Sequence, residues 1–353
     1  MMLSPPSFIL LKSSQPRKLS LVVVADKEEK AKAIQNYEKY TYLKALNNLE
    51  EFIKFRKQVL GHYSASLLPK KLELLQILAV SKRKPLNLEI DYKPYSQPQE
   101  HKDVIPLTFT SSLLLDLNIS SNIKLDKHLS KAYYDDDWKA SDALFYLYQK
   151  NKDVYVLDDV LTTGSVGLKS NRKPIPTKHA ITAVDDIIAK SLYKEIKHYS
   201  PNKEIMLFIH QSYHNLFYIL ALPGLWSFEL NETFSTSTQT WKDYEILQPR
   251  KEYASNTTGG YYAVRLPLLE FAVKTKLQYS FIVFRIITPK YYKSAGVWML
   301  REAIRDALSK NPLKFNSTKE ALKYISYHSA GKLDKAISRS TLLKLQTSQK
   351  KLF

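Results

Sequence analysis

The sequence predicts a mixed fold of the α+β class, in which a large N-terminal region combines helices with a mixed sheet and a smaller α/β C-terminal region follows. Three observations lead to this prediction. The 353 residues are 44% hydrophobic and 25% charged, so the chain can bury a sizeable core. Stretches with helical spacing of apolar residues occur along the chain together with short apolar runs typical of strands. A Ser/Thr-rich segment at 231–241 marks a change of composition between the two regions.

The first 150 residues contain the clearest periodic signals. Apolar residues that recur at threes and fours predict a long helix over 27–60. Pro85 would end a second helix, which spans 70–82. A third helix is expected in "DDDWKASDALFYLYQK", with the acids from Asp135 to Asp137 at the positive end of its dipole. Strands are expected at 19–24 and 86–92.

The remaining elements follow from short apolar runs and their punctuation. The run "VYVL" at 154–157 is interpreted as a strand, and the strands at 204–210 and 215–230 should pair around a turn. A buried strand is expected at 279–287, with helices after Gly259-Gly260 and over 297–310. The expected regions are 1–235, 236–340 and a basic tail at 341–353.

Charge and composition restrict the class of function. The 53 Lys and Arg residues exceed the 34 Asp and Glu residues by 19, which favours polyanionic partners, nucleic acid first and an anionic membrane surface second. The alternative is a Lys-rich solvated surface of the kind found in heat-loving organisms. The absence of cysteine excludes disulfides and Cys-ligated metal sites. No apolar run approaches the roughly 18 residues of a membrane span, so we expect a cytoplasmic protein with no membrane partner.

The segment "RKPIPTKHAITAVDD" at 172–186 carries the strongest local signal. Thr182 and Asp185 have the spacing of a capping box, which predicts a helix beginning at Thr182. Prolines at 174 and 176 would stiffen the chain before that helix. Four cations precede this expected helix start, and no acidic residue lies among them: Lys169, Arg172, Lys173 and Lys178. Cations next to the amides of a helix N-terminus are typical of a site that binds phosphate or nucleic acid. The alternative is a solvated basic loop in which Asp185 only caps.

Other polar residues are weaker candidates. Arg285 lies in an apolar strand and needs a partner, for which Glu270 or Glu302 is expected, in either a structural ion pair or a ligand site. Acidic pairs such as Asp158-Asp159 could hold Mg²⁺ if two of them converged, but helix-start acids are more often caps, so no metal ligands are assigned. Common nucleophile and zinc motifs are absent, which leaves catalysis undecided. The residues considered for an active site or ligand contact are His179, Asp185, Asp186, Arg265, Arg285 and Glu302.

Five blocks in order resemble the conserved motifs of the archaeal Nre DNA-repair family: "SPPS", "LELLQILAVSKRKPLNLEI", "RKPIPTKHAITAVDD", "GGYYAVRLPLLE" and "PKYYKSAGVWMLREAIRDAL". They cover nearly the whole chain. The resemblance implies an N-terminal and a C-terminal conserved region and a role in DNA repair. Some members carry a Cys zinc motif, which this cysteine-free chain lacks, and others end in a peptide that binds the replication sliding clamp.

The end of the chain, "LQTSQKKLF", matches such a peptide in part. Gln349 with Leu352 gives the Gln-x-x-aliphatic pattern, and Phe353 follows at once, but the second aromatic residue is missing. A register from Gln346 fits less well, and a disordered basic tail is the alternative. The leading hypothesis is therefore a DNA-repair factor that binds nucleic acid and docks on the sliding clamp. The alternatives are an enzyme acting on a nucleotide or nucleic-acid phosphate at the 164–186 loop, and a structural adaptor.

Overall fold

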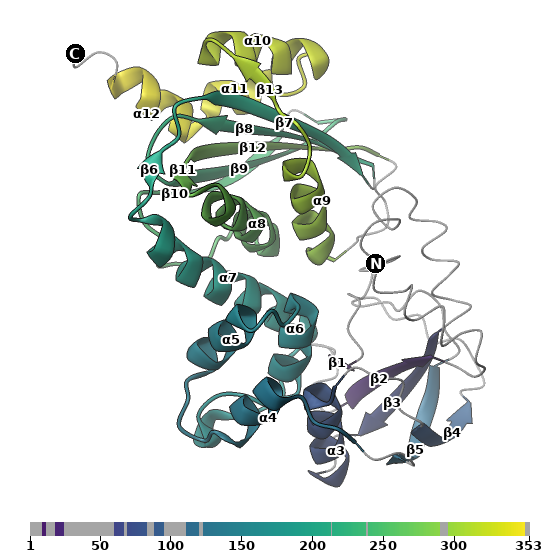
Figure 1. Ribbon diagram of the computed structural model, residues 1–353. Helices are drawn as coiled ribbons and strands as arrows, with labels where there is room; N and C mark the ends of the chain where they lie inside the picture. The colour runs from purple at the N-terminus through teal and green to yellow at the C-terminus, as the bar shows by residue number, and fades with distance from the viewer. Residues whose placement is uncertain are drawn as a thin grey trace. The chain divides into compact units, whose positions relative to one another are not determined.

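The computed structural model describes residues 9–11, 18–24, 60–66, 69–82, 88–94, 111–119, 123–212, 214–237, 239–289 and 296–349 (Figure 1). The chain forms two compact units. Unit 1 comprises residues 1–188 with 293–296, and unit 2 comprises 189–292 with 297–353. Helices and mixed sheets together confirm the α+β prediction. Most of the long helix expected over 27–60 lies outside the described residues, and Leu60 belongs to a strand.

Unit 1 combines one sheet with a group of helices. The described strands form a sheet in the order β1-β2-β3-β5-β4 and are β1 (Ile9–Leu11), β2 (Lys18–Val24), β3 (Leu60–Ser66), β4 (Leu88–Pro94) and β5 (Ser111–Ile119). The helices are α3 (Pro69–Val80), α4 (Lys127–Tyr134), α5 (Ala140–Gln149), α6 (Val154–Thr162), a 3₁₀ turn η1 (Lys169–Asn171) and the first part of α7 (Thr177–Ile196). The strands expected at 19–24 and 86–92 and the helix expected at 70–82 are thereby confirmed.

Helix α6 contradicts the strand expected at "VYVL". Its N-cap is Asp153, whose carboxylate accepts a hydrogen bond from the amide of Tyr155. Eight of its nine residues are buried, including Asp158 and Asp159. A helix buried on every side has no polar stripe, so its apolar run cannot be distinguished from a buried strand by periodicity.

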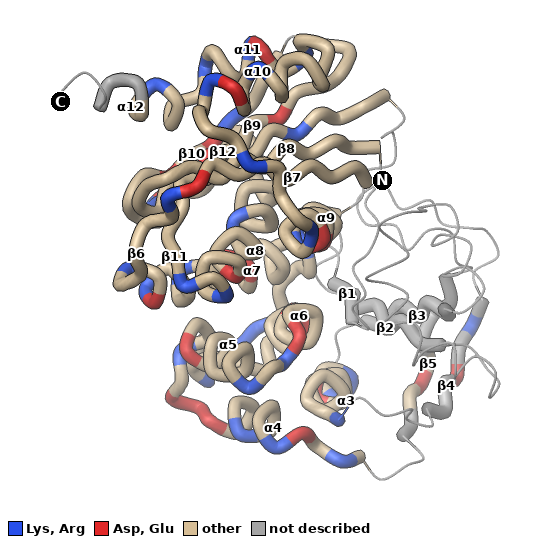
Figure 2. Tube along the Cα trace, turned by 45° about the horizontal axis from the view of Figure 1, so that its top comes forward, with Lys and Arg blue, Asp and Glu red and all other residues tan. Residues whose placement is uncertain are grey.

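The acidic run at 135–137 follows the end of helix α4 and does not cap helix α5. The expectation that these acids lie at the N-terminal end of the next helix is therefore wrong. Asp135 is the C-cap of α4, and its Oδ1 accepts from the amides of Asp137 and Trp138 at 3.2 and 3.1 Å. Helix α5 begins later, at Ala140, with Lys139 as its N-cap and no side-chain capping bond. The acidic residues lie in the connection between α4 and α5, which is red in Figure 2.

Unit 2 contains a six-stranded sheet in the order β10-β9-β12-β8-β7-β13. Among the described strand pairs of this sheet, only β9 and β12 are parallel. The strands are β7 (Ile205–Ser212), β8 (Asn215–Leu222), β9 (Ser227–Phe234), β10 (Thr240–Ile246), β12 (Ser280–Ile287) and β13 (Leu313–Phe315), and a separate parallel pair joins β6 (Ser200–Pro201) to β11 (Leu277–Gln278). The antiparallel β7–β8 pair and the strand at 279–287 confirm the expected elements. The Ser/Thr-rich segment at 231–241 includes the turn between β9 and β10.

Helices cover both faces of this sheet. Helices α8 (Gly259–Thr275) and α9 (Trp298–Leu308) lie on one face, and α10 (Thr318–His328), α11 (Asp334–Arg339) and α12 (Thr341–Gln349) lie on the other (Figure 1). Leu220, Ile282 and Phe284 are fully buried on the α10 side, and Phe217, Phe281 and Phe228 are fully buried in the core. Two helices that the sequence predicts, after Gly259-Gly260 and over 297–310, are α8 and α9.

Helix α12 is attached to the sheet through one buried carboxylate. Glu229 of β9 is fully buried and accepts hydrogen bonds from the Ser340 hydroxyl and from the amides of Thr341 and Leu342. These donors lie at the start of α12, where unsatisfied amides and the helix dipole favour a negative charge. Glu229 therefore acts as an N-cap supplied by another element of the fold.

The loop after α6 depends on a glycine, and this generates a first prediction. Gly164 has φ +68°, and a Cβ at this position would lie 2.7 Å from the Lys173 carbonyl carbon. Gly331 has a similar φ of +71°, but its Cβ would meet only the Asp334 carboxylate, at 3.3 Å. We expect Gly331→Ala to lower the free energy of unfolding by about 1–2 kcal/mol, because alanine disfavours the left-handed conformation. Gly164→Ala should lower it by typically 1–3 kcal/mol more, because the backbone at Lys173 must also move. Urea unfolding of both variants measures the difference, and equal costs would contradict the close approach.

Candidate functional site

A pocket of about 360 Å³ lies at the basic loop of unit 1. The loop leaves α6 at Gly164 and reaches α7 at Thr177. Three cations, one amide side chain and an otherwise apolar wall line the pocket, and no acidic residue is among the lining side chains of the described chain. The lining residues are Lys139, Ala140, Leu161, Gly164, Val166, Gly167, Leu168, Asn171, Arg172, Lys173 and Ile175.

Arg172 holds this loop in shape. Its Nε donates to the carbonyl of Gly167 at 2.7 Å, and its two terminal nitrogens donate to the carbonyls of Tyr133 and Asp135 at 2.7 and 2.5 Å. Three fixed bonds from one planar guanidinium define both the position and the orientation of the acceptors. The sequence predicts that Arg172 contacts phosphate; in the structure its guanidinium also joins the loop to the C-terminal end of α4.

Lys169 is exposed, and its positive charge is paired with the carboxylate of Asp136. Its ammonium lies 2.8 Å from an Asp136 carboxylate oxygen, and the Arg172 guanidinium lies 3.6 Å from the other oxygen. The hydrogen bond from Lys169 lowers the pKa of Asp136, whose carboxyl group is partly exposed to solvent. Lys169 does not line the pocket, and an exposed pair of this kind contributes little to stability.

Lys173 and Lys178 form no ion pair with the residues that the structure describes. Lys173 is exposed and lines the pocket, whereas Lys178 is half-buried on the first turn of α7 beside the exposed His179. Helix α7 begins at Thr177, because the amides of His179 and Ala180 bond to the carbonyl of Pro176. The predicted start at Thr182 is therefore wrong by five residues. The proline that precedes the helix made this earlier start available.

The aspartates of α7 lie beyond its first turn. Asp185 is fully buried and Asp186 is half-buried, and neither lines the pocket. Asp185 is consequently not a first-turn cap, and Thr182 donates instead to the carbonyl of Lys178. Within the described ranges, no group of three or more His, Asp or Glu side chains is arranged to hold a metal ion.

Arg265 belongs to a buried network in unit 2. Its Nε donates to Glu245 Oε1 at 2.8 Å, and the same oxygen accepts from the indole of Trp226 at 2.7 Å. The hydroxyl of Tyr261 donates to Glu245 Oε2 at 2.8 Å. Burial and the Glu245 charge raise the pKa of Tyr261, so this hydroxyl remains a donor. The network joins α8 to β10, which is a structural role for Arg265.

Arg285 finds its partner on the neighbouring strand. Its Nη1 lies 2.6 Å from Glu232 Oε1, and its Nε donates to the Asn215 side chain at 3.0 Å. Arg285 and Glu232 are directly opposite each other in the parallel β12–β9 pair. The ion pair expected with Glu270 or Glu302 is thus made by Glu232, a residue that strand periodicity alone cannot place next to Arg285.

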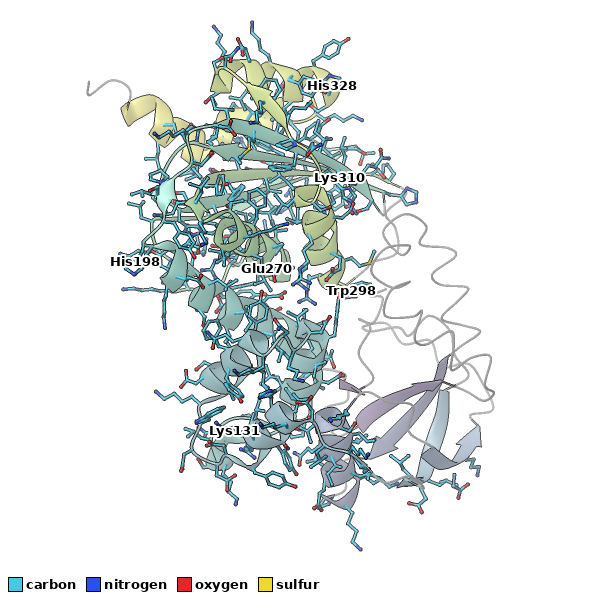
Figure 3. The ribbon with its side chains drawn as sticks, viewed as in Figure 1. Lys131, His198, Glu270, Trp298, Lys310 and His328 are labelled. Atoms are coloured by element: carbon cyan, nitrogen blue, oxygen red, sulfur yellow. The ribbon has the colours of Figure 1, made fainter. Side chains whose placement is uncertain are left out.

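Glu302 and Glu270 pair with Arg305 instead. Arg305 donates to both oxygens of Glu270 at 2.7 and 2.9 Å and to Glu302 at 3.0 Å. Burial opposes the charge of Arg305, but both carboxylates raise its pKa further than burial lowers it. Glu270 is labelled on α8 in Figure 3, and these contacts join α8 to α9. Glu302 therefore has a structural role here.

His210 is a buried polar residue that the sequence did not single out. It lies on β7 in the same row of the sheet as Phe217 and Arg285. Its Nδ1 is 3.1 Å from the ammonium of Lys310, which is labelled in Figure 3, and 3.3 Å from the carboxylate of Asp306. Burial lowers the pKa of His210, with a further lowering by Lys310 and an opposing effect of Asp306.

The expected clamp-binding residues lie at the limit of the described chain. Gln349 is the last residue of α12, and Leu352 and Phe353 lie outside the described residues. The only sequence signal for this peptide is the spacing of its glutamine, aliphatic and aromatic residues. None of the described helices is long and apolar enough to cross a lipid bilayer.

Comparison with known proteins covers nearly the whole chain. The family profile described as "Archaeal Nre, N-terminal" matches residues 1–242, and "Archaeal Nre, C-terminal" matches residues 245–353. The chain belongs to the archaeal Nre family. No solved structure matches it.

Three Nre relatives carry names that state a process. A "DNA repair protein NreA" of Archaeoglobus fulgidus is 34% identical over 268 residues, which cover 74% of this chain and 68% of that protein. A "DNA repair protein NreB" of the same organism is 31% identical over 307 residues, 84% of this chain and 78% of that protein. A "DNA repair protein NreA" of Haloferax volcanii is 32% identical over 201 residues, 54% of this chain and 48% of that protein.

The lowered pKa of His210 gives a prediction for stability against pH. When the pH falls through about 6.5, an unfolded histidine takes up a proton that the folded site resists, so the free energy of unfolding decreases. His210→Gln should therefore lose less stability than the parent protein between about pH 7.5 and pH 5. Thermal melts over this range measure the effect, and His198→Gln, at an exposed position in the turn after α7, is the control. A pH profile of His210→Gln identical to that of the parent would contradict the account.

Proposed function

We propose that this Nre protein is a DNA-repair factor that binds nucleic acid through the basic loop and pocket of unit 1. The observation that supports the proposal is the pocket itself, in which Lys139 and Lys173 are exposed and no acidic side chain is present in the lining. The net charge of +19 favours a polyanion, and the names of three relatives supply the process of DNA repair.

The competing interpretation is an enzyme that acts on a nucleotide or nucleic-acid phosphate at the 164–186 loop. Such chemistry would be favoured if acids and cations lined one cleft, because metal-assisted phosphoryl transfer requires carboxylates near the phosphate. Asp185, Asp186 and His179 do not line the pocket. This distribution favours binding, and catalysis becomes an outcome of the same experiment when it is run with and without Mg²⁺.

A salt titration tests the DNA contact. Each phosphate neutralised on duplex DNA contributes about 0.9 to the slope of log K against log salt. Replacing Lys139, Lys173 and Lys178 with glutamine should weaken binding and reduce this slope by about 2–3. The matched control replaces Lys319, Lys323 and Lys332 with glutamine, three exposed lysines at the α10 end of unit 2. Slopes that fall equally in both triple variants, or in neither, would contradict a contact at the pocket.

Clamp docking is the second part of the proposed function. Two features support it, the partial match at Gln349, Leu352 and Phe353 and the attachment of α12 by Glu229, which fixes the point from which the last residues begin. We expect an archaeal sliding clamp to bind the full chain with a Kd of tens of micromolar, which corresponds to a binding free energy of roughly −6 kcal/mol. We expect no binding to a chain that ends at Ser348. Calorimetry with both proteins measures this. Lys350→Ala with Lys351→Ala is the control, and equal binding of the full and shortened chains would contradict docking by the tail.

A further inference from the structure

The pocket at the basic loop has two chemically different parts. The exposed ammonium groups of Lys139 and Lys173 carry positive charge at the lining. The apolar part comes from side chains such as Leu161, Val166 and Ile175. Inorganic phosphate would use only the charged part, whereas a ligand that also carries a flat, weakly polar group would use both.

The start of helix α5 adds backbone donors to the charged part. Lys139 is the N-cap, Ala140 is the first helical residue, and both line the pocket. The first bonded amides are those of Asp142 and Ala143, which donate to the carbonyl of Lys139. The amides of Ala140 and Ser141 precede them, at the end of the helix dipole that attracts anions.

Lysine is a poor choice for this position if stability alone matters. N-caps are usually Ser, Thr, Asp or Asn, whose side chains accept from the first amides, and a cation is repelled by the positive end of the dipole. Lys139 makes no capping bond, and Arg172 and Lys173 line the same pocket. Positive charge gathered against local preference is typical of a functional site, where a bound anion relieves the repulsion.

The remaining walls show how closely a ligand can approach. Gly167 has φ +114°, and a Cβ there would lie 3.3 Å from the Cβ of Ala140, so the loop backbone packs against the first residue of α5. Asn171 supplies the only side-chain amide of the lining, and an amide can both donate to and accept from the edge of a base. The volume of about 360 Å³ is at the small end of ligand pockets.

We propose that this pocket binds a single nucleotide, with its phosphate at the start of α5 between Lys139 and Lys173 and its base against the apolar wall. The proposal rests on the proposed function and narrows it from nucleic acid in general to one terminal or extruded nucleotide. Arg172 positions the wall through the carbonyls of Gly167, Tyr133 and Asp135 and is not required to touch the ligand.

Calorimetric titration with three small probes tests the ligand class: dAMP, deoxyadenosine and inorganic phosphate. We expect dAMP to bind at least about tenfold more tightly than either of the others, because only dAMP uses both parts of the pocket, a difference of about 1.4 kcal/mol. Equal affinities for dAMP and inorganic phosphate would overturn the proposal.

Lys139→Asp separates binding from folding. The aspartate supplies the missing N-cap, so thermal stability should be retained or increased, while dAMP affinity should fall at least tenfold. Lys150→Asp makes the same charge change at the exposed other end of α5 and should leave dAMP affinity unchanged. Unaltered dAMP binding in Lys139→Asp would overturn the proposal.

Competition distinguishes a free nucleotide from a nucleotide within DNA. We expect dAMP to displace a labelled 5′-phosphorylated single strand from the protein, and a strand with a 5′-hydroxyl to be displaced at lower dAMP concentration. If the protein binds strands with the expected salt dependence but dAMP neither binds nor competes, the nucleotide pocket is wrong and the DNA-binding function stands. If no strand binds at all, the proposed function itself fails.

Discussion

The three hydrogen bonds of the Arg172 guanidinium are the constraint on which the pocket depends. They join the carbonyl of Gly167, in the loop after α6, to the carbonyls of Tyr133 and Asp135 at the end of α4. Because the acceptors are backbone groups, the bonds fix the course of the chain and leave the neighbouring lysines free to serve a ligand. The close approach of Gly164 to the Lys173 backbone and the bond from the Ile175 amide to the Thr162 carbonyl tie the same loop to α6. The pocket is thus preorganised by backbone contacts.

The charged residues of unit 2 have a different use. Arg265, Arg285 and Arg305 each pair with a carboxylate on a neighbouring element, and Glu229 caps α12 from the sheet. Arg265 and Arg285 form the buried pairs, and removing one partner of a buried pair costs about 3–5 kcal/mol because the other charge is left in a low-dielectric interior. These arginines and glutamates therefore specify how helices seat on the sheet. Lys139 and Lys173 of the pocket in unit 1 form no ion pair with the described residues and are the better candidates for contact with an anion.

The sequence could predict the elements whose signals are local. Short apolar runs on either side of the turn before Asn215 predicted the β7–β8 pair, and apolar spacing together with the flanking residues predicted α3, α8 and α9. It failed for α6, because burial on all sides removes the amphipathic pattern, and for the start of α7, because the carbonyl of Pro176 begins the helix before the apparent capping box.

The site was predictable only in part. The basic loop was found from its run of cations, but the role of Arg172 depends on carbonyls more than 30 residues away in the sequence. Lys139 was missed because its importance arises from the loop that packs next to it. One local signal could have indicated it: a lysine precedes the helix where a capping residue is expected. The partner of Arg285 was wrong because strand order is a property of the whole sheet.

The most direct test of a nucleotide phosphate at the start of α5 is the amide NMR spectrum of the protein during titration with dAMP. Bonding of the phosphate should shift the Ala140 and Ser141 amide protons downfield, because these amides donate to it. The chemical shifts of the amides at the other end of α5, near Lys150, should not change. Saturable shifts at Ala140 and Ser141 that disappear in Lys139→Asp are the result that this account predicts. Saturable dAMP binding that leaves both amides unmoved would contradict it.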